Sequence, residues 1–191
     1  MLIELEQVQR MMDWIRKKLY LETIVSKART RLVKRGQVYK CDFGRGIGSE
    51  MGKERPAIIV QNDIGNQHSG NTIVIPVTHN SHQSPCIISL TPILTNEGEI
   101  LLDGQANASN ITCVSKARLG DFITTLSADD MKKIDEAMAK SLGIMSYYAN
   151  MKKKLNNKIE YCLRVKKERN EAQDEVVMLK RELHSQNDKT F

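Results

Sequence analysis

The chain has 191 residues, of which 40% are hydrophobic and 5% aromatic, and it carries a formal net charge of +6. Such a length suits one core domain with appendages, or two small domains. We find no signal peptide and no apolar run near the roughly 20 residues of a membrane-spanning helix, so we expect a cytoplasmic protein without membrane contact. The moderate positive charge is compatible with a nucleic-acid partner and does not demonstrate one.

The spacing of cysteines and histidines gives no sign of a metal or redox centre. The four cysteines lie singly in the sequence, and no C-x-x-C pair occurs. The histidines likewise lack the spacing of metal ligands. We therefore expect no metal and no cofactor, with the cysteines serving as core or strand residues.

Residues 1–32 are predicted to form an N-terminal amphipathic helix. Apolar side chains recur there at spacings of three and four, which lines one helix face: Met1, Leu5, Val8, Met12, Ile15 and Leu19. A basic cluster at residues 27–35 follows. A solvated helix end is the simpler interpretation of this cluster, and a phosphate-binding arm is the alternative.

Residues 33–145 are predicted to form a small antiparallel β-domain. Short β-favouring runs recur every 10 or so residues with turn signals between them, which is typical of a barrel or sandwich. The runs are 38–43, 55–61, 72–78, 86–90, 100–102, 111–114 and 122–126. A helix from Ala128 to Leu142 is expected to close the domain, because Ser127 and Asp130 have capping-box form and Gly143 suits the helix end.

Residues 146–191 contain no glycine or proline and are predicted to form a coiled-coil-like helix. Apolar residues there follow one a/d frame over four heptads: Met151, Leu155, Cys162, Val165, Ala172, Val176, Leu179 and Leu183. Lys158 and Arg169 interrupt the frame. The alternative is an amphipathic helix packed against its own β-domain or the N-terminal helix.

The most informative stretch is 35–80, which is predicted to run strand, loop, strand, loop, strand. A glycine-rich loop at residues 44–54 carries Glu50 and ends at Arg55–Pro56, at the start of an apolar run. A second, turn-rich loop spans 62–71, and the third strand ends at Thr78. We expect Arg55 and Thr78 to lie side by side in a strand-end cleft that handles a phosphodiester.

The residue types at this cleft suit phosphate chemistry. A planar guanidinium stays charged and binds two phosphate oxygens at once, and preorganised donors are often the largest catalytic contribution. Thr78 can donate a further hydrogen bond to the phosphate or the leaving oxygen. Because arginine is a poor base, Glu50 is the better candidate base, whereas strand alternation would point His79 to the other face.

A set of short sequence words spans residues 35–144. They are RGQVY at 35–39, GSE at 48–50, RPAIIV at 55–60, QNDIGN at 61–66, KARL at 116–119, IDEA at 134–137 and SLG at 141–143. Taken together, these words resemble the MazF/PemK family of toxin ribonucleases.

The resemblance implies an α+β fold: a small SH3-like antiparallel β-barrel with a C-terminal helix, here flanked by long N- and C-terminal helices. It implies a homodimer that cleaves single-stranded RNA selectively by sequence, without a metal, by attack of the RNA 2′-hydroxyl, and that a cognate antitoxin protein blocks. Its catalytic residues correspond to Arg55, Thr78 and Glu50. We also expect RNA contacts from nearby polar and basic residues: Lys53, Asn62, Asn80, Lys116 and Arg118.

Two other functions remain open at this point. One is a non-catalytic, CcdB-like toxin that binds DNA gyrase with the same fold. The other is an inactive barrel that serves as an assembly module. The presence of both Arg55 and Thr78 favours the ribonuclease, whereas Asn110 and Thr112 stand where the family often has glutamine and arginine.

Overall fold

A computed structural model describes residues 4–79 and 84–187, with side chains described up to residue 181. The predictions for Met1, for Asn80 and for the side chain of Leu183 therefore lie outside the described residues. The chain divides into two units, Met1–Gly143 and Ile144–Phe191, and each is described here by itself.

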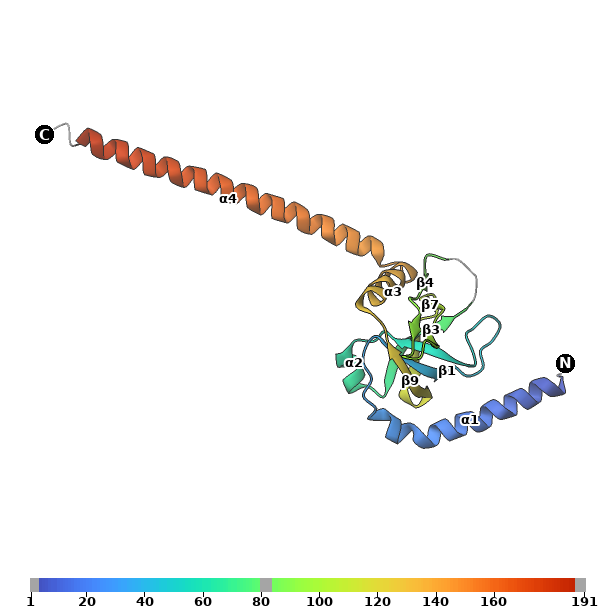
Figure 1. Cartoon of the computed structure of the whole chain (residues 1–191). Helices are drawn as coiled ribbons and strands as arrows, with labels where there is room; N and C mark the ends of the chain where they lie inside the picture. Colours follow the sequence, from blue (N-terminus) through green and yellow to red (C-terminus); the bar gives the residue numbers. More distant parts are fainter. Residues whose placement is uncertain (1–3, 80–83, 188–191) are drawn as a thin grey trace. The chain divides into compact units, whose positions relative to one another are not determined.

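An antiparallel sheet forms the centre of the first unit (Figure 1). Its strands follow the order β4-β7-β3-β2-β1-β9, and β8 also pairs with β3. They are β1 (Gln37–Asp42), β2 (Glu54–Ile59), β3 (Asn71–Thr78), β4 (Ile87–Ser89), β7 (Gln105–Asn107), β8 (Thr112–Ser115) and β9 (Leu119–Thr125). The antiparallel arrangement predicted from the spacing of the β-favouring runs is confirmed.

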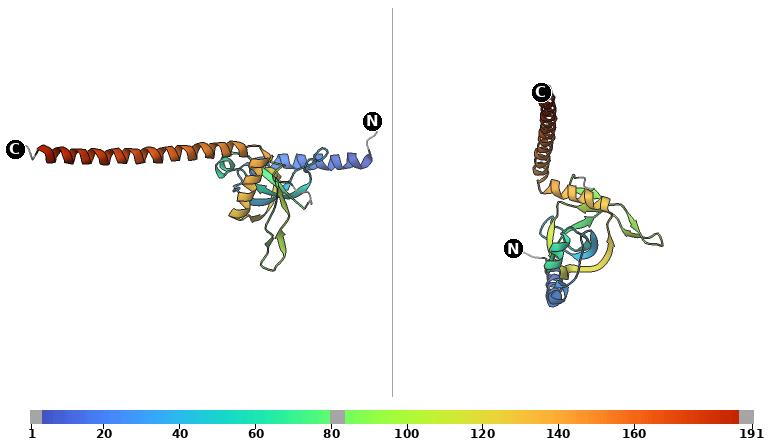
Figure 2. Two further views of the ribbon diagram at one scale, coloured as in Figure 1. Left: turned by 90° about the horizontal axis from the view of Figure 1, so that it is seen from above. Right: turned by 90° about the vertical axis from the view of Figure 1, so that its left-hand side faces the viewer.

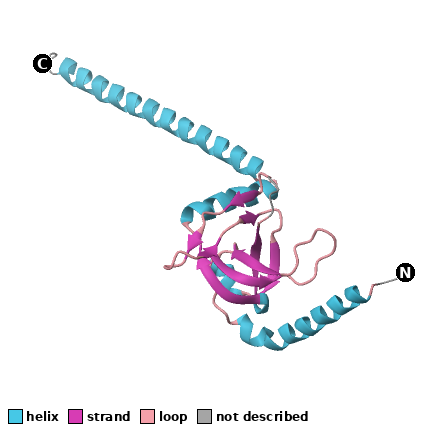
Figure 3. Cartoon of the chain, turned by 45° about the vertical axis from the view of Figure 1, so that its right-hand side comes forward, coloured by secondary structure: helices cyan, strands magenta, loops and turns pink. Residues whose placement is uncertain are grey.

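Two expectations about the strands need correction. The predicted barrel is not closed among the described residues: β4 and β9 end the sheet without pairing to each other, although the strands curl strongly (Figure 3). The short strands β5 (Ile93–Leu94) and β7 were not predicted. β5 has only two residues, and β7 (Gln-Ala-Asn) lacks the β-branched and aromatic residues that mark a strand. The hairpin of β5 and β6 (Ile100–Leu102) projects from the sheet (Figure 2).

The three central strands are buried on both faces. Alternate residues point to opposite faces of a strand, so Val38, Ile58 and Ile75 join one apolar cluster, and Tyr39, Ala57 and Val74 join the other. Arg55 lies two residues before Ala57 on β2, so its side chain points to the same face as the second cluster. The short buried runs seen in the sequence correspond to this two-sided core.

The predicted closing helix is confirmed as α3 (Ala128–Ser141). The hydroxyl of Ser127 accepts from the backbone N–H of Asp130 at 3.1 Å, and Gly143 follows the helix with φ of +69°. The Asp130 carboxylate does not complete a capping box. It accepts hydrogen bonds from Thr91 and Lys133 instead, and so links the helix to the segment after β4.

The segment predicted to be a turn-rich loop contains a short helix, α2 (Asp63–His68). The side chain of Asn62 caps it by accepting from the backbone N–H of Gly65 at 2.7 Å. A single turn of 3-10 helix, η1 (Lys116–Arg118), precedes β9. Of these two elements, α2 packs against β3, whereas η1 packs against α1.

The predicted N-terminal helix is confirmed as α1 (Leu5–Arg29), but its contact face was not predicted. The apolar stripe through Leu5, Met12 and Leu19 is exposed. The residues with reduced exposure are instead Trp14, Leu21, Ile24 and Ala28. The basic cluster that follows is partly used inside the fold, since Arg31 donates to backbone carbonyls of β9 and Arg35 pairs with Asp135.

The second unit is a single helix, α4 (Met145–Asn187), 43 residues long. The predicted helix is confirmed, and the described members of its apolar frame are exposed within this unit. Among the described residues, no helix is both long and apolar enough to cross a membrane.

Candidate active site

The register of β2 and β3 relates the two predicted catalytic positions to each other. Ala57 of β2 pairs with Pro76 of β3, and extending this antiparallel register by two residues sets Arg55 opposite Thr78. Cross-strand neighbours share one face of a sheet. Arg55 and Thr78 therefore occupy the same face at the same end of the β2–β3 pair, and their shared cleft stays a prediction.

Arg55 is half-buried and held from the loop that precedes it. Its Nε donates to the carbonyl oxygen of Gly52 at 3.1 Å, and a terminal nitrogen lies 3.6 Å from the sulfur of Met51. A guanidinium has five N–H donors, and within the described part of the chain these two contacts leave others available for phosphate oxygens.

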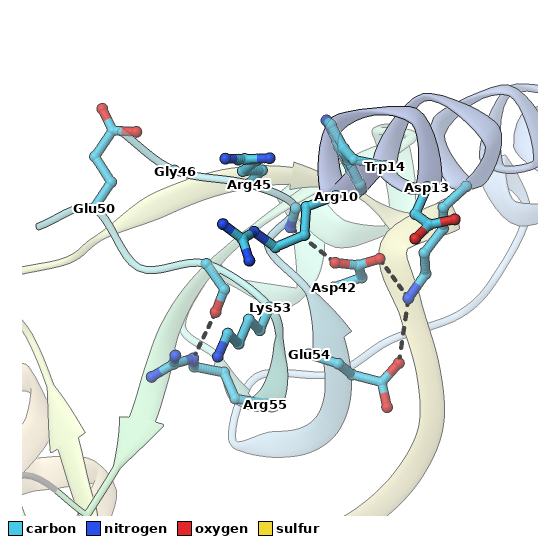
Figure 4. A pocket seen from close by; sticks show the side chains of 13 residues that line it. Arg10, Asp13, Trp14, Asp42, Arg45, Gly46, Glu50, Lys53, Glu54 and Arg55 are labelled. Atoms are coloured by element: carbon cyan, nitrogen blue, oxygen red, sulfur yellow. Dashed lines mark hydrogen bonds and ion pairs between the residues drawn. The ribbon is translucent and has the colours of Figure 1, made fainter. Parts of the chain in front are cut away.

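The guanidinium lies in a pocket of about 590 Å³ between the β1–β2 loop and α1 (Figure 4). Arg55 also lines an adjoining hollow of about 480 Å³ with Lys40, Leu101 and the half-exposed Phe122. Arg55 is thus shared by two neighbouring concavities. Thr78, although described by the structure, is not among the residues that line either of them.

Backbone hydrogen bonds close the neck of the β1–β2 loop. The N–H of Phe43 donates to the carbonyl of Lys53 at 3.0 Å, and the N–H of Lys53 donates to that of Gly44 at 2.7 Å. Lys53 is the one non-glycine residue with positive φ, at 63°, among the described residues. Such strain is costly in isolation and collects at functional sites.

The structure does not bring Glu50 to Arg55. The Glu50 carboxylate accepts from the backbone N–H of Ile47 at 2.8 Å within the same loop, and Figure 4 shows it pointing away from the guanidinium. Use of Glu50 as a base therefore requires a movement of the loop. Glu50 and Lys53 both line the pocket of Arg55, but the described contact of the Glu50 carboxylate is with its own loop.

The surroundings of Thr78 depend on a glycine. A Cβ on Gly104, which has φ of +102°, would stand 2.8 Å from the Thr78 carbonyl oxygen. Next to it, His79 pairs with Asp103 at 2.7 Å. The turn before β7 thus packs directly on the backbone of Thr78, and His79 is engaged away from the Arg55 face.

Three of the residues predicted to contact RNA make contacts within the fold. Burial contradicts the one at Lys116, which is 1% exposed: its amine donates to the carbonyl of Asn66 at 2.6 Å, and desolvation lowers its pKa. Asn62 caps α2. Arg118 donates to the Asp42 carbonyl at 3.0 Å and stacks over Trp14.

Sequence reasoning missed the contribution of α1. Arg10, Asp13, Trp14 and Lys17 line the pocket of Arg55. Lys17 lies 2.6 Å from the Asp42 carboxylate and 3.8 Å from that of Glu54. The hydrogen-bonded pair with Asp42 raises the pKa of Lys17. One feature of the sequence could have indicated this contact: Trp14, the chain's single tryptophan, lies off the apolar stripe of the helix.

Neither a reactive thiol nor a metal site is found near Arg55 among the described residues. Burial raises the pKa of Cys41, the neighbour of Arg55 on β1, to about 12, so its thiol stays protonated. Among the described residues, no cluster of three or more histidine, cysteine or acidic side chains is placed to hold a metal ion.

Known proteins with similar sequences cover the same region. The chain is 35% identical over 121 residues to Endoribonuclease EndoA of Bacillus subtilis, an alignment that spans 61% of this chain and 99% of that protein. It is 32% identical over 110 residues to Endoribonuclease MazF1 of Mycobacterium bovis, spanning 58% and 92%. The crystal structure of MazF (Form-I) from Deinococcus radiodurans superposes with a TM-score of 0.52 at 20% identity, covering 59% and 98%, and so shares the fold.

Residues 34–142 match the family described as PemK-like, MazF-like toxin of type II toxin-antitoxin system. The fold and the strand-end site thus define a toxin-type β-domain. The chain belongs to the PemK/MazF toxin family, which confirms the resemblance seen in the sequence words. Both α1 and α4 lie outside the matched residues.

Proposed function

We propose that the protein is the toxin of a type II toxin–antitoxin pair and acts as a metal-independent, sequence-selective endoribonuclease on single-stranded RNA. Family membership and the two relatives named endoribonucleases support the class of reaction. The observation that carries the proposal is the position of the Arg55 guanidinium in a pocket that Arg10, Arg45 and Lys53 also line. The β2–β3 register, extended by two residues, supports a role for Thr78 beside it.

The proposed reaction uses the RNA 2′-hydroxyl as the nucleophile. A bond forms between the 2′-oxygen and phosphorus while the bond from phosphorus to the 5′-oxygen breaks. The 2′-hydroxyl gives its proton to a base, and the departing 5′-oxygen receives one. The products are a 2′,3′-cyclic phosphate and a 5′-hydroxyl.

The guanidinium of Arg55 is proposed to bind the nonbridging phosphate oxygens, where negative charge accumulates in the transition state. The Thr78 hydroxyl would donate to the same phosphate or to the leaving oxygen. Glu50 is the proposed base because a carboxylate oxygen can accept a proton, whereas the guanidinium of an arginine holds its own. Its hydrogen bond to Ile47 must open for this role.

The proposed partners follow from the family. A toxin of this class acts against single-stranded RNA and is neutralised by a cognate antitoxin protein, and we propose a homodimer as the active assembly. Selectivity for an RNA sequence would come from loop side chains that contact unstacked bases.

The test is RNA cleavage by the purified full-length protein in EDTA, comparing wild type with Arg55→Ala and Arg55→Lys. Loss of a preorganised charged donor reduces turnover about 100- to 1000-fold, and lysine should restore little because it lacks the planar fork. Cleavage that requires a divalent metal would contradict the mechanism. Gyrase inhibition without cleavage of any RNA would instead support the CcdB-like alternative.

A further inference from the structure

The first turns of α1 and the β1–β2 loop form two walls of one pocket. Arg10 reaches into it from the helix, while Arg45 and Lys53 come from the loop (Figure 4). The wall formed by α1 lies outside the toxin domain, because α1 precedes the matched residues 34–142.

Contacts hold α1 in place at this point. The Trp14 ring packs so closely on Gly44 that a Cβ there would stand 2.6 Å from it. The Arg118 guanidinium lies 5.2 Å from the centre of the Trp14 ring. A terminal nitrogen of Arg45 donates to the carbonyl of Gln7 at 3.1 Å. Arg10 is thus presented by an anchored helix.

The pocket is lined by five cationic side chains and by four acidic ones, of which Asp13 pairs with Arg16 and Glu50 accepts from the backbone N–H of Ile47. Lys17 compensates the acidic side chains of Asp42 and Glu54. Arg10 has only an exposed partner on its own helix, Glu6 at 2.9 Å, and such pairs are weak. Within the part of the chain that the structure describes, the Lys53 amine has no ion pair.

We propose that α1 is part of the RNA-binding cleft and that Arg10 binds a backbone phosphate next to the one held at Arg55. The inference rests on the proposed ribonuclease function and extends it to a helix outside the toxin domain. Arginine suits this contact because its fork binds phosphate oxygens in pairs, and phosphate contacts fix the register of the nucleic acid. Arg10 therefore acts in binding and not in the chemical step.

The experiment compares full-length Arg10→Ala with Arg16→Ala. Arg16 lies on the same helix and is exposed, but it pairs with Asp13 at 3.7 Å and does not line the pocket. The probe is a fluorescent single-stranded RNA with a 2′-deoxy nucleotide at the cleavage position. We expect Arg10→Ala to weaken binding about 5- to 10-fold and to reduce the salt slope by roughly 0.7 to 1, as for one lost phosphate contact.

The same substitution should raise KM for cleavable RNA and leave kcat unchanged, while Arg16→Ala alters neither. Trp14 fluorescence, the only tryptophan signal of the chain, reports whether α1 stays docked. If Arg10→Ala shifts that signal, Arg10→Gln, which keeps a long helix-forming side chain, replaces it in the comparison.

If the wild type cleaves RNA but Arg10→Ala and Arg16→Ala bind RNA equally well, the inference about α1 is wrong while the proposed ribonuclease function stands. Wild type that neither binds nor cleaves RNA would overturn both. If Arg10→Ala leaves RNA binding unchanged but weakens binding of a polyglutamate peptide, the helix serves an acidic protein partner, and the inference is wrong.

Discussion

At the residue scale, the proposed function depends on a single arginine, Arg55, at a strand end. Arg55 pairs with Cys41 on one side and lies in register with Thr78 on the other. The sequence predicted this pair because strand ends and alternation are local properties. It could not place Glu50, whose direction is set by a hydrogen bond to Ile47 inside an irregular loop.

Two substitutions at Lys53 distinguish the effect of its backbone strain on stability from the effect of its charge on RNA binding. We expect Lys53→Gly and Lys53→Ala to weaken RNA binding alike, several-fold, since both remove a pocket cation. Only glycine relieves the left-handed φ of 63°, a conformation that costs other residues about 1–2 kcal/mol. Lys53→Gly should therefore be more stable in urea than Lys53→Ala. Equal stability of the two variants would contradict the strain argument.

At the scale of elements, α1 shows where periodicity fails as a guide. Its existence was predicted, but the apolar stripe that defined it is exposed, and it contacts the sheet through Trp14 and Lys17 instead. Periodicity counts apolar residues and does not show which face fits a partner. The large ring of Trp14 fits because position 44 is glycine.

Substitution at two loop glycines tests the anchoring of α1. Both Gly44 and Gly48 have positive φ, but a Cβ meets Trp14 only at position 44 and meets nothing within 4 Å at position 48. We expect both alanine variants to lose about 1–2 kcal/mol of stability. Only Gly44→Ala should also shift the fluorescence of Trp14. Identical emission from the two variants would show that α1 does not depend on this contact.

A buried carboxylate links α3 to the segment after β4, and the link depends on pH. Burial alone would raise the pKa of Asp130, but hydrogen bonds from Lys133 and Thr91 outweigh it and lower the pKa. A lowered folded-state pKa stabilises the protein above the ordinary value near 4, and this stability is lost as pH falls through the folded-state pKa.

Asp130→Asn should therefore lower the free energy of unfolding by about 1–3 kcal/mol at pH 7, and the difference from wild type should shrink in acid. Asp129→Asn is the matched control, because Asp129 is exposed in the same helical turn. Urea unfolding at several pH values gives the measurement. A difference that does not change with pH would disprove the linkage.

At the scale of the whole molecule, the toxin domain carries a long helix with a seam suited to pairing. Outside the a/d frame of α4, lysines 152, 166 and 180 share the e position, and glutamates 168 and 175 share g. In a parallel pair a g residue faces the e residue of the next heptad, so Glu175 would meet Lys180 of a second copy, whereas Glu168 would meet the uncharged Gln173. The Glu175–Lys180 contact is therefore the charge pair that tests parallel pairing with a second copy.

Removal of residues 146–191 should lower the average mass of the protein in sedimentation equilibrium at micromolar concentration, because the apolar seam is lost. Glu175→Lys in the full-length chain should weaken the assembly, and adding Lys180→Glu should restore it. An unchanged mass after the deletion would exclude assembly through the helix.

The sequence sufficed for the β-domain and its Arg55–Thr78 end, because both follow from strand patterns and from words shared with a family. It did not reveal that Lys116 is buried beneath Asn66, or that the sheet stays open between β4 and β9. Those features depend on packing between distant segments, which no local pattern specifies.

The central claim is that Arg55 drives metal-independent cleavage of RNA by its own 2′-hydroxyl. The most direct measurement is single-turnover cleavage of single-stranded RNA in EDTA by full-length wild type, Arg55→Ala and Arg16→Ala, with the product ends identified by mass spectrometry. We predict 2′,3′-cyclic phosphate and 5′-hydroxyl ends from wild type and Arg16→Ala, and a rate at least 100-fold lower for Arg55→Ala. Undiminished cleavage by Arg55→Ala, or products with 5′-phosphate ends, would contradict the account.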